Sequence, residues 1–178
     1  MGKVITLDAG HGGYDSGATA NGIQEKDANL ALTLRIAADL TMLNPSNRII
    51  FTRTADKTVA LRDRAVISDM YKSDLFVSIH HNAGGGSGFE SHVHPSASYI
   101  ARHLQERIQL AVEQISTDFG IAVRRAKQSN FQVLRDTDAP AILLETLFVD
   151  NIVDSKWIMN PNWQHTFSYT IAQVINNA

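Results

Sequence analysis

The chain has 178 residues, of which 44% are hydrophobic and 19% charged, so we expect one globular domain over residues 1–178 with a sizeable core. The formal net charge is −2 and no long basic run is present, which gives nucleic-acid binding no electrostatic support. The sequence has no cysteine, which excludes disulfides and leaves histidine and carboxylate side chains as ligands of any bound metal.

The first predicted element is a strand over residues 3–7, which is rich in β-branched and apolar side chains. It runs into the segment Asp-Ala-Gly-His-Gly-Gly at residues 8–13, which predicts a sharp turn that carries His11. Glycine has no Cβ, so the glycines of this turn let the backbone bend and leave space beside the imidazole.

The remaining elements alternate along the chain. We first expect a loop over 14–24, a helix over 27–43 with Asp27 as its N-cap, a strand over 48–52 and a helix over 61–71. Strands over 75–79 and 89–94 follow, and then a helix over 97–118 that Gly120 ends. The last predicted elements are strands over 130–134 and 141–144 and a helix over 162–177. Because strands alternate with helices, the pattern predicts an α/β sheet covered on both faces.

Polar residues follow three of the apolar strands. His11 follows the first strand, His80 follows residues 75–79, and Glu145 follows residues 141–144. In open α/β sheets, ligands bind outside the carboxyl ends of the strands, so we expect these side chains to share one site.

Two of these residues are candidate metal ligands. With Glu25, which precedes the first helix, His11 and His80 would make a set of two histidines and one carboxylate. Catalytic zinc typically has three such protein ligands and one open position. The alternative is that each is an ordinary hydrogen-bonded or exposed polar residue, because the three match no local motif such as H-E-x-x-H.

Two further histidine arrangements compete with that set. His80 and His81 are adjacent, and adjacent side chains of a strand point to opposite faces, so only one can face the site; His80 fits the apolar alternation better. Glu90, His92 and His94 would share one face of their strand as a rival metal set, although an exposed polar face explains them equally well.

Glu145 is the most informative residue, because apolar residues precede and follow it. A carboxylate in such surroundings is poorly solvated, which raises its pKa and suits a general base that works near neutral pH. The alternative is a structural ion pair between Glu145 and an arginine such as Arg53 or Arg64.

Five segments of the sequence, in this order, resemble the motifs of a known family: DAGHGGYDSGA, QEKDANL, TRTAD with LRDR, SIHHN, and AILLET. The chain is similar over nearly its whole length to the zinc-dependent N-acetylmuramoyl-L-alanine amidases of the LytC/CwlC type, the amidase_3 family. The resemblance implies a twisted, mixed, mostly parallel sheet of about six strands with helices on both faces.

The same resemblance implies an activity and a cofactor. Family members hydrolyse the amide between the lactyl group of N-acetylmuramic acid and the first L-alanine of the peptidoglycan stem peptide. The family motifs assign Zn2+ to His11, Glu25 and His80, and the catalytic carboxylate to Glu145.

Further positions in the motifs are interpreted as support for the site. We expect Asp15 to order its loop, and Arg64 and Asn82 to support the site without taking part in the chemistry. An open groove is expected along the carboxyl edge of the sheet, floored by the turn at residues 12–13 and the loop at residues 82–88, because a glycan strand that carries peptides needs a long open surface.

Other functions remain open at this point: a zinc peptidase that cuts within the stem peptide, a non-catalytic wall-binding module, or phosphate binding by the Gly-rich turn, which lacks the full G-x-G-x-x-G spacing. We expect peptidoglycan as the substrate of a monomer that neither binds nucleic acid nor inserts into a membrane.

No apolar run approaches the ~18 residues of a membrane span, and no signal peptide is visible. Two situations fit these observations. One is a phage endolysin or a mother-cell lysis enzyme, which is made in the cytoplasm and reaches the cell wall on lysis or release. The other is a domain excised from a secreted protein.

Overall fold

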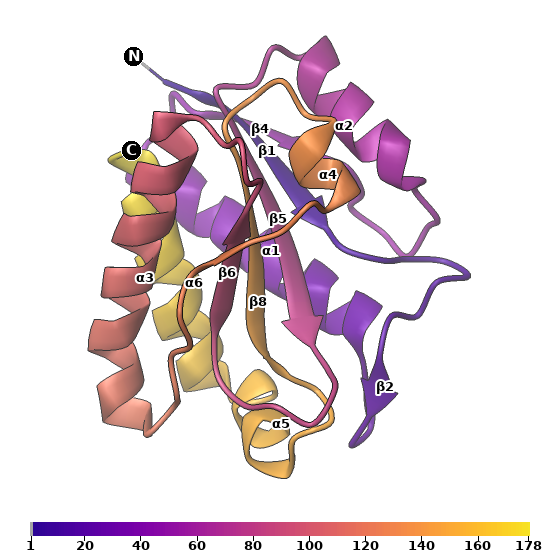
Figure 1. Cartoon of the computed structure of the whole chain (residues 1–178), viewed down its shortest axis with the longest axis vertical. Helices are drawn as coiled ribbons and strands as arrows, with labels where there is room; N and C mark the ends of the chain where they lie inside the picture. Colours follow the sequence, from indigo (N-terminus) through magenta and orange to yellow (C-terminus); the bar gives the residue numbers. More distant parts are fainter. Residues whose placement is uncertain (1) are drawn as a thin grey trace.

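In the computed structural model, which describes residues 2–178, six strands form one mixed sheet (Figure 1). In the order β4-β1-β5-β8-β6-β7, they are β4 (Arg48–Phe51), β1 (Val4–Ala9), β5 (Leu75–Asn82), β8 (Ala141–Phe148), β6 (Glu90–Val93) and β7 (Lys127–Gln128). Only the β6–β8 pair is antiparallel among the pairings of this sheet. The expected mostly parallel sheet of about six strands is confirmed.

Helices cover both faces of the sheet, which is why its central strands are almost continuously apolar. One face packs against α1 (Glu25–Leu43), α3 (Tyr99–Phe119) and α6 (Pro161–Asn176) in the main hydrophobic core. The other carries α2 (Leu61–Met70) and α4 (Gln132–Arg135), with a smaller apolar cluster around Phe76 and Leu143. Within residues 2–178, each helix is too short or too polar to span a membrane.

Two expected elements differ in the structure. Helix α1 begins at Glu25 with Gln24 as its N-cap, so the prediction of Asp27 as the N-cap is wrong; Asp27 lies in the first turn, where its charge complements the helix dipole. Residues 130–134 were expected to form a strand, but α4 begins at Gln132, because this segment leaves the sheet edge and packs over Phe76 and Leu143.

Four short elements were not predicted from the sequence. These are the hairpin of β2 (Thr19–Ala20) and β3 (Ile23–Gln24), the edge strand β7, and the helix α5 (Ile152–Ile158) that follows β8. The side chain of Asn151 caps α5 by accepting hydrogen bonds from the N–H groups of Val153 and Asp154. The hairpin places the start of α1 beside the turn that follows β1.

A buried ion pair lies beneath that turn. Asp8 is fully buried in β1 and accepts hydrogen bonds from Arg64 Nη1 (2.7 Å), Thr52 Oγ1 (2.7 Å) and Ser78 Oγ (2.6 Å). Burial alone would raise the pKa of Asp8, but the Arg64 charge and the two hydroxyl donors outweigh it and lower the pKa. Arg64 Nη2 also donates to the carbonyl oxygen of His11 (2.8 Å), which ties the turn to the ion pair.

Arg53 is buried too, and all of its hydrogen bonds go to carbonyl oxygens. Its Nε donates to Ala9 (2.9 Å), and its Nη2 donates to both Gly10 (2.8 Å) and Lys26 (2.7 Å). One guanidinium therefore joins the turn after β1 to the first turn of α1, which contains Glu25.

The position of Arg53 leads to a first prediction. Lysine cannot replace the planar fork of donors, so Arg53→Lys should leave buried carbonyl groups unsatisfied and lower the free energy of unfolding by about 2–4 kcal/mol. Urea denaturation measures this change. The matched control is Arg62→Lys, because Arg62 is exposed on α2 and makes no ion pair or side-chain hydrogen bond within residues 2–178; it should change stability by less than ~0.5 kcal/mol. Equal stabilities for the two variants would contradict the bridging role of Arg53.

Candidate active site and metal centre

Three polar side chains converge at the carboxyl edge of the sheet. His11 lies in the turn after β1, Glu25 is the first residue of α1, and His80 lies in β5. Glu25 Oε1 is 3.1 Å from both His11 Nε2 and His80 Nδ1, and one ligand atom from each residue lies within 4.8 Å of the others. The residues that the sequence predicted as one set are therefore brought together.

The donor set fits a metal ion. Two ligand atoms at about 2.0–2.1 Å from a tetrahedral zinc lie roughly 3.3 Å apart, which is close to the observed 3.1 Å separations. Two imidazole nitrogens and one carboxylate oxygen are a ligand set of catalytic zinc sites, and they leave a fourth position open. Small adjustments of the side chains would therefore suffice to hold the ion.

His11 is oriented by Asp15. Its Nδ1 lies 2.7 Å from Asp15 Oδ2, so the carboxylate accepts that proton and leaves Nε2 directed toward Glu25. The other oxygen of Asp15 accepts a hydrogen bond from the N–H of Gly17 (3.0 Å), as expected for a residue that orders the loop. His11 has a φ of 60°, which is uncommon for a residue with a side chain and is stabilised by the bond from Arg64 to its carbonyl.

Glu25 is held in its ionised form. Its Oε2 accepts the N–H of Ala18 (3.0 Å), and its Oε1 accepts Asn29 Nδ2 (3.2 Å). Burial raises the pKa of Glu25, but the hydrogen bonds from His11 and His80 outweigh burial and lower the pKa. The hydrogen bond to Glu25 in turn raises the pKa of His11 to about 9, so metal uptake at this site must release a proton.

Two glycines make the approach of these side chains possible. A Cβ on Gly10 would overlap the imidazole of His80, and a Cβ on Gly17 would lie 2.5 Å from Glu25 Oε2 and 2.7 Å from His11 Cδ2. The prediction that the glycines of the first turn leave space beside the His11 imidazole is wrong, because Gly10 makes room for His80, and it is Gly17 that makes room for His11.

His81 lies on the opposite face of β5, as strand alternation predicts. Its Nδ1 donates to Asn29 Oδ1 (2.8 Å), and the side chain is buried. Burial lowers the pKa of His81 to about 4, so this imidazole is neutral at pH 7. Asn29 in turn donates to Glu25, so the His81 imidazole reaches this candidate ligand through Asn29, whereas the His81 backbone N–H donates directly to Glu25 Oε1 (3.3 Å).

Glu145 lies beside His80 in the neighbouring strand, in direct register with it. Its Oε2 is buried and has no hydrogen-bond partner among the described residues, and burial raises its pKa to about 7. The alternative of an ion pair with an arginine is wrong, because Arg53 binds carbonyl groups and Arg64 binds Asp8. Glu145 is thus a poorly solvated carboxylate with a free oxygen beside the candidate metal ligands.

His11, Asp15, His80 and Glu145 line an open cavity of about 540 Å³. Gly12 contributes to it as expected, but the prediction that residues 82–88 form its floor is wrong. The walls are formed instead by the segments 58–61 and 131–133, which precede and begin α2 and α4. The loop at 82–88 is held away from the cavity, since the N–H groups of Gly84 and Gly85 bind Asp150, and Asn82 Oδ1 accepts a bond from its own loop.

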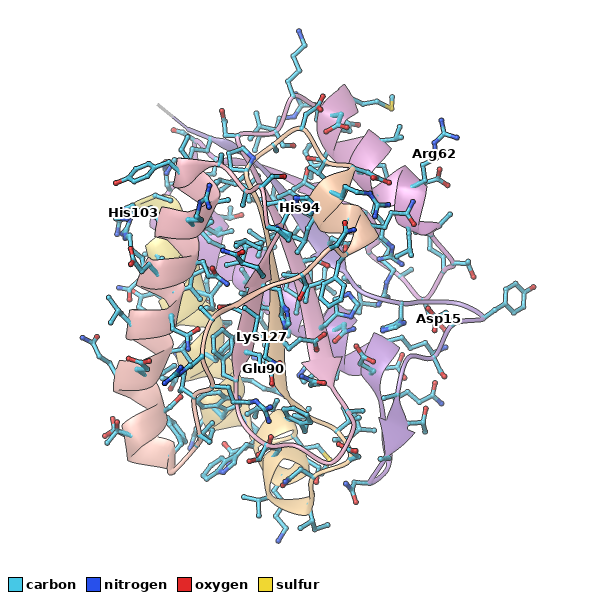
Figure 2. The ribbon with its side chains drawn as sticks, in the orientation of Figure 1. Asp15, Arg62, Glu90, His94, His103 and Lys127 are labelled. Atoms are coloured by element: carbon cyan, nitrogen blue, oxygen red, sulfur yellow. The ribbon has the colours of Figure 1, made fainter. Side chains whose placement is uncertain are left out.

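The rival metal set does not assemble. The carboxylate of Glu90 is occupied by two cations, Arg124 and Lys127, and His94 lies well apart from it (Figure 2). The exposed polar face that was the alternative explanation is also wrong, because Glu90 and His92 are buried. The reason is the segment 121–131, which crosses over this part of the sheet.

The sequence matches the Amidase_3 family, described as N-acetylmuramoyl-L-alanine amidase, over residues 5–177. It is 40% identical over 152 residues to the sporulation-specific N-acetylmuramoyl-L-alanine amidase of Bacillus subtilis (strain 168), a match that covers 85% of this chain and 58% of that protein. It is 43% identical over 154 residues to the endolysin of Bacillus phage SPP1, covering 85% of this chain and 56% of that protein. The chain thus spans little more than half the length of these relatives.

Solved structures agree with this assignment. The N-acetylmuramoyl-L-alanine amidase of Clostridium difficile 630 superposes with a TM-score of 0.90 at 28% identity, covering 98% of this chain and 95% of that one. The catalytic domain of CwlV, the amidase of Bacillus (Paenibacillus) polymyxa var. colistinus, superposes with a TM-score of 0.87 at 30% identity, covering 98% and 97%. The chain therefore belongs to the Amidase_3 family of N-acetylmuramoyl-L-alanine amidases.

Proposed function

We propose that this protein is a zinc-dependent peptidoglycan hydrolase that cleaves the amide between the lactyl group of N-acetylmuramic acid and the L-alanine of the stem peptide. The observation that carries the proposal is the convergence of His11, Glu25 and His80 next to Glu145. Glu145 Oε2 is buried and has no hydrogen-bond partner within residues 2–178, and His11, His80 and Glu145 line an open cavity. Membership of the amidase family supports the same reaction.

In this proposal, His11 Nε2, a carboxylate oxygen of Glu25 and His80 Nδ1 hold the metal. When bound, zinc polarises the amide carbonyl and lowers the pKa of a water molecule to about 7. Glu145 takes the proton of the attacking water and then delivers it to the nitrogen of the leaving L-alanine, so one carboxylate serves as base and then as acid. Asp15 keeps the His11 imidazole in the required tautomer.

The biological setting is part of the proposal. Among the relatives are an endolysin of a Bacillus phage and a sporulation-specific amidase. We therefore propose that the enzyme acts on the cell wall during lysis.

The reaction is tested by its products. Incubation with purified peptidoglycan should expose free L-alanine amino termini and leave the reducing ends of the glycan unchanged, and prior treatment with a chelator should abolish release until zinc is restored. New amino termini from a residue other than this alanine would instead identify a peptidase that cuts within the stem peptide.

The metal assignment is tested by two adjacent histidines. His80→Ala should lose stoichiometric zinc and all activity, because one of three ligands is removed. His81→Ala should retain zinc and most activity but melt at a lower temperature, because a buried hydrogen bond to Asn29 is lost. Zinc content and thermal melting on the same preparations provide the comparison. Loss of zinc in His81→Ala alone would move the ligand by one position.

The role of Glu145 is tested by Glu145→Gln, which keeps the size of the side chain but cannot accept a proton. The variant should fold, bind zinc and lose at least ~100-fold in kcat. In the parent enzyme, kcat/KM should fall as the pH decreases through a value at or below about 7, because the base must be ionised and its pKa is raised to about 7 by burial. If Glu145→Gln keeps activity within a few-fold, the base lies elsewhere; if zinc is lost as well, Glu145 is a ligand.

A further inference from the structure

A pair of cations is anchored one strand away from Glu145 and has no part in the proposed reaction. Glu90 in β6 pairs in register with Glu145 in β8, so the two carboxylates lie on adjacent strands. Glu90 is only 2% exposed and forms ion pairs with Arg124 through Nε and with Lys127 through Nζ (2.7 Å). The side chains of Arg124 and Lys127 are each 42% exposed, so one buried anion holds two cations at the surface. Figure 2 labels Glu90 and Lys127.

The Arg124 guanidinium is fixed in place and still has free donors. Its Nε is used by Glu90, and its plane lies over the ring of Phe148, 5.4 Å from the ring centroid. A Cβ on Gly86 would come within 2.8 Å of its Nη1, so the glycine leaves room for this side chain. The two Nη groups make no hydrogen bond to any residue in the part of the chain that the structure describes. The two cations and Glu90 together carry a net charge of about +1.

The proposed chemistry directs the substrate toward these cations. Glu145 protonates the leaving nitrogen, so the peptide side of the scissile amide lies on the Glu145 side of the metal ligands. The strands β5, β8 and β6 are consecutive in the sheet and carry His80, Glu145 and Glu90 in register. A peptide that continues past Glu145 in this direction therefore reaches Arg124 and Lys127.

We propose that Arg124 and Lys127 form a subsite that binds a carboxylate of the stem peptide on the leaving-amine side of the scissile bond. The inference rests on the proposed amidase function and adds a determinant of substrate choice. Charge-assisted hydrogen bonds from a guanidinium and an ammonium are the usual means of binding a carboxylate, and the fork of Arg124 Nη groups suits its geometry. Glu90 is a positioning residue, because it holds both cations without reaching the substrate.

The test compares two soluble, uncrosslinked glycan preparations with identical stem peptides, except that the residue after alanine carries a free carboxylate in one and a carboxamide in the other. The wild-type enzyme should cleave the acid form roughly tenfold more efficiently in kcat/KM. In Arg124→Gln and in Lys127→Gln this ratio should fall toward one, while cleavage of the amide form stays within about threefold of wild type. Zinc content and thermal melting are measured on each preparation.

Arg125→Gln is the matched control. Arg125 is the neighbouring residue of the same segment, is exposed, and makes no ion pair or side-chain hydrogen bond within residues 2–178. This variant should keep the wild-type ratio. Should Arg124→Gln fail to fold, Lys127→Gln decides the question, since it leaves the Arg124–Glu90 pair in place.

Three outcomes would overturn the subsite. One is a wild-type ratio close to one, the second is an unchanged ratio in both variants, and the third is an equal loss on both substrates, which would make the cations structural only. A wild-type enzyme that releases no alanine amino termini from either preparation would overturn the proposed function together with this inference, whereas the first three outcomes leave the amidase function intact.

Discussion

Two buried guanidinium groups, those of Arg53 and Arg64, hold the backbone that carries the first candidate metal ligand. Burying a cation costs several kcal/mol unless its donors are satisfied, and the two arginines meet this condition in different ways. Arg64 pairs with Asp8, whereas Arg53 binds carbonyl groups of the turn and of α1. These bonds fix the turn with His11 in its uncommon conformation and set its distance from Glu25.

Two glutamates of this site differ in protonation because their surroundings differ. Glu25 is surrounded by imidazole, amide and backbone donors, and its pKa is lowered, so it is a permanent anion suited to a cation. Glu145 Oε2 is buried and has no hydrogen-bond partner within residues 2–178, and burial raises the pKa of Glu145 to about 7, so it exchanges a proton near neutral pH. Titratable groups whose pKa values are pushed apart in this way are typical of acid–base assignments in active sites.

The sequence predicted the positions of the strand-end residues well, because parallel strands bring their carboxyl ends to one edge. The alternation in β5 separated His80 from His81 correctly for the same geometric reason. Local pattern could not predict that residues 131–133 wall the cavity, nor that Glu90 is buried, because both depend on residues 121–135 crossing over the sheet. The other wall, residues 58–61, is a segment leading into α2 that only the tertiary fold places beside the site. The alternating apolar residues of 130–134 are typical of a strand, yet they pack as a helix over Phe76.

The placement of Glu90 reconciles two requirements on Glu145. In the proposed reaction, a base with a raised pKa needs surroundings that solvate it poorly, whereas the leaving peptide is polar and would be bound by charged partners. Glu145 lies in β8, whereas the residue that anchors the charged partners, Glu90, lies in the neighbouring strand β6. Glu145 Oε2 has no hydrogen-bond partner among residues 2–178, and the charge of Glu90 adds to the effect of burial in raising the pKa of Glu145. Arg124 and Lys127 lower the pKa of Glu90 against the effect of its burial and keep it ionised. Because both cations are anchored by Glu90 on the neighbouring strand, they do not neutralise the proposed base directly.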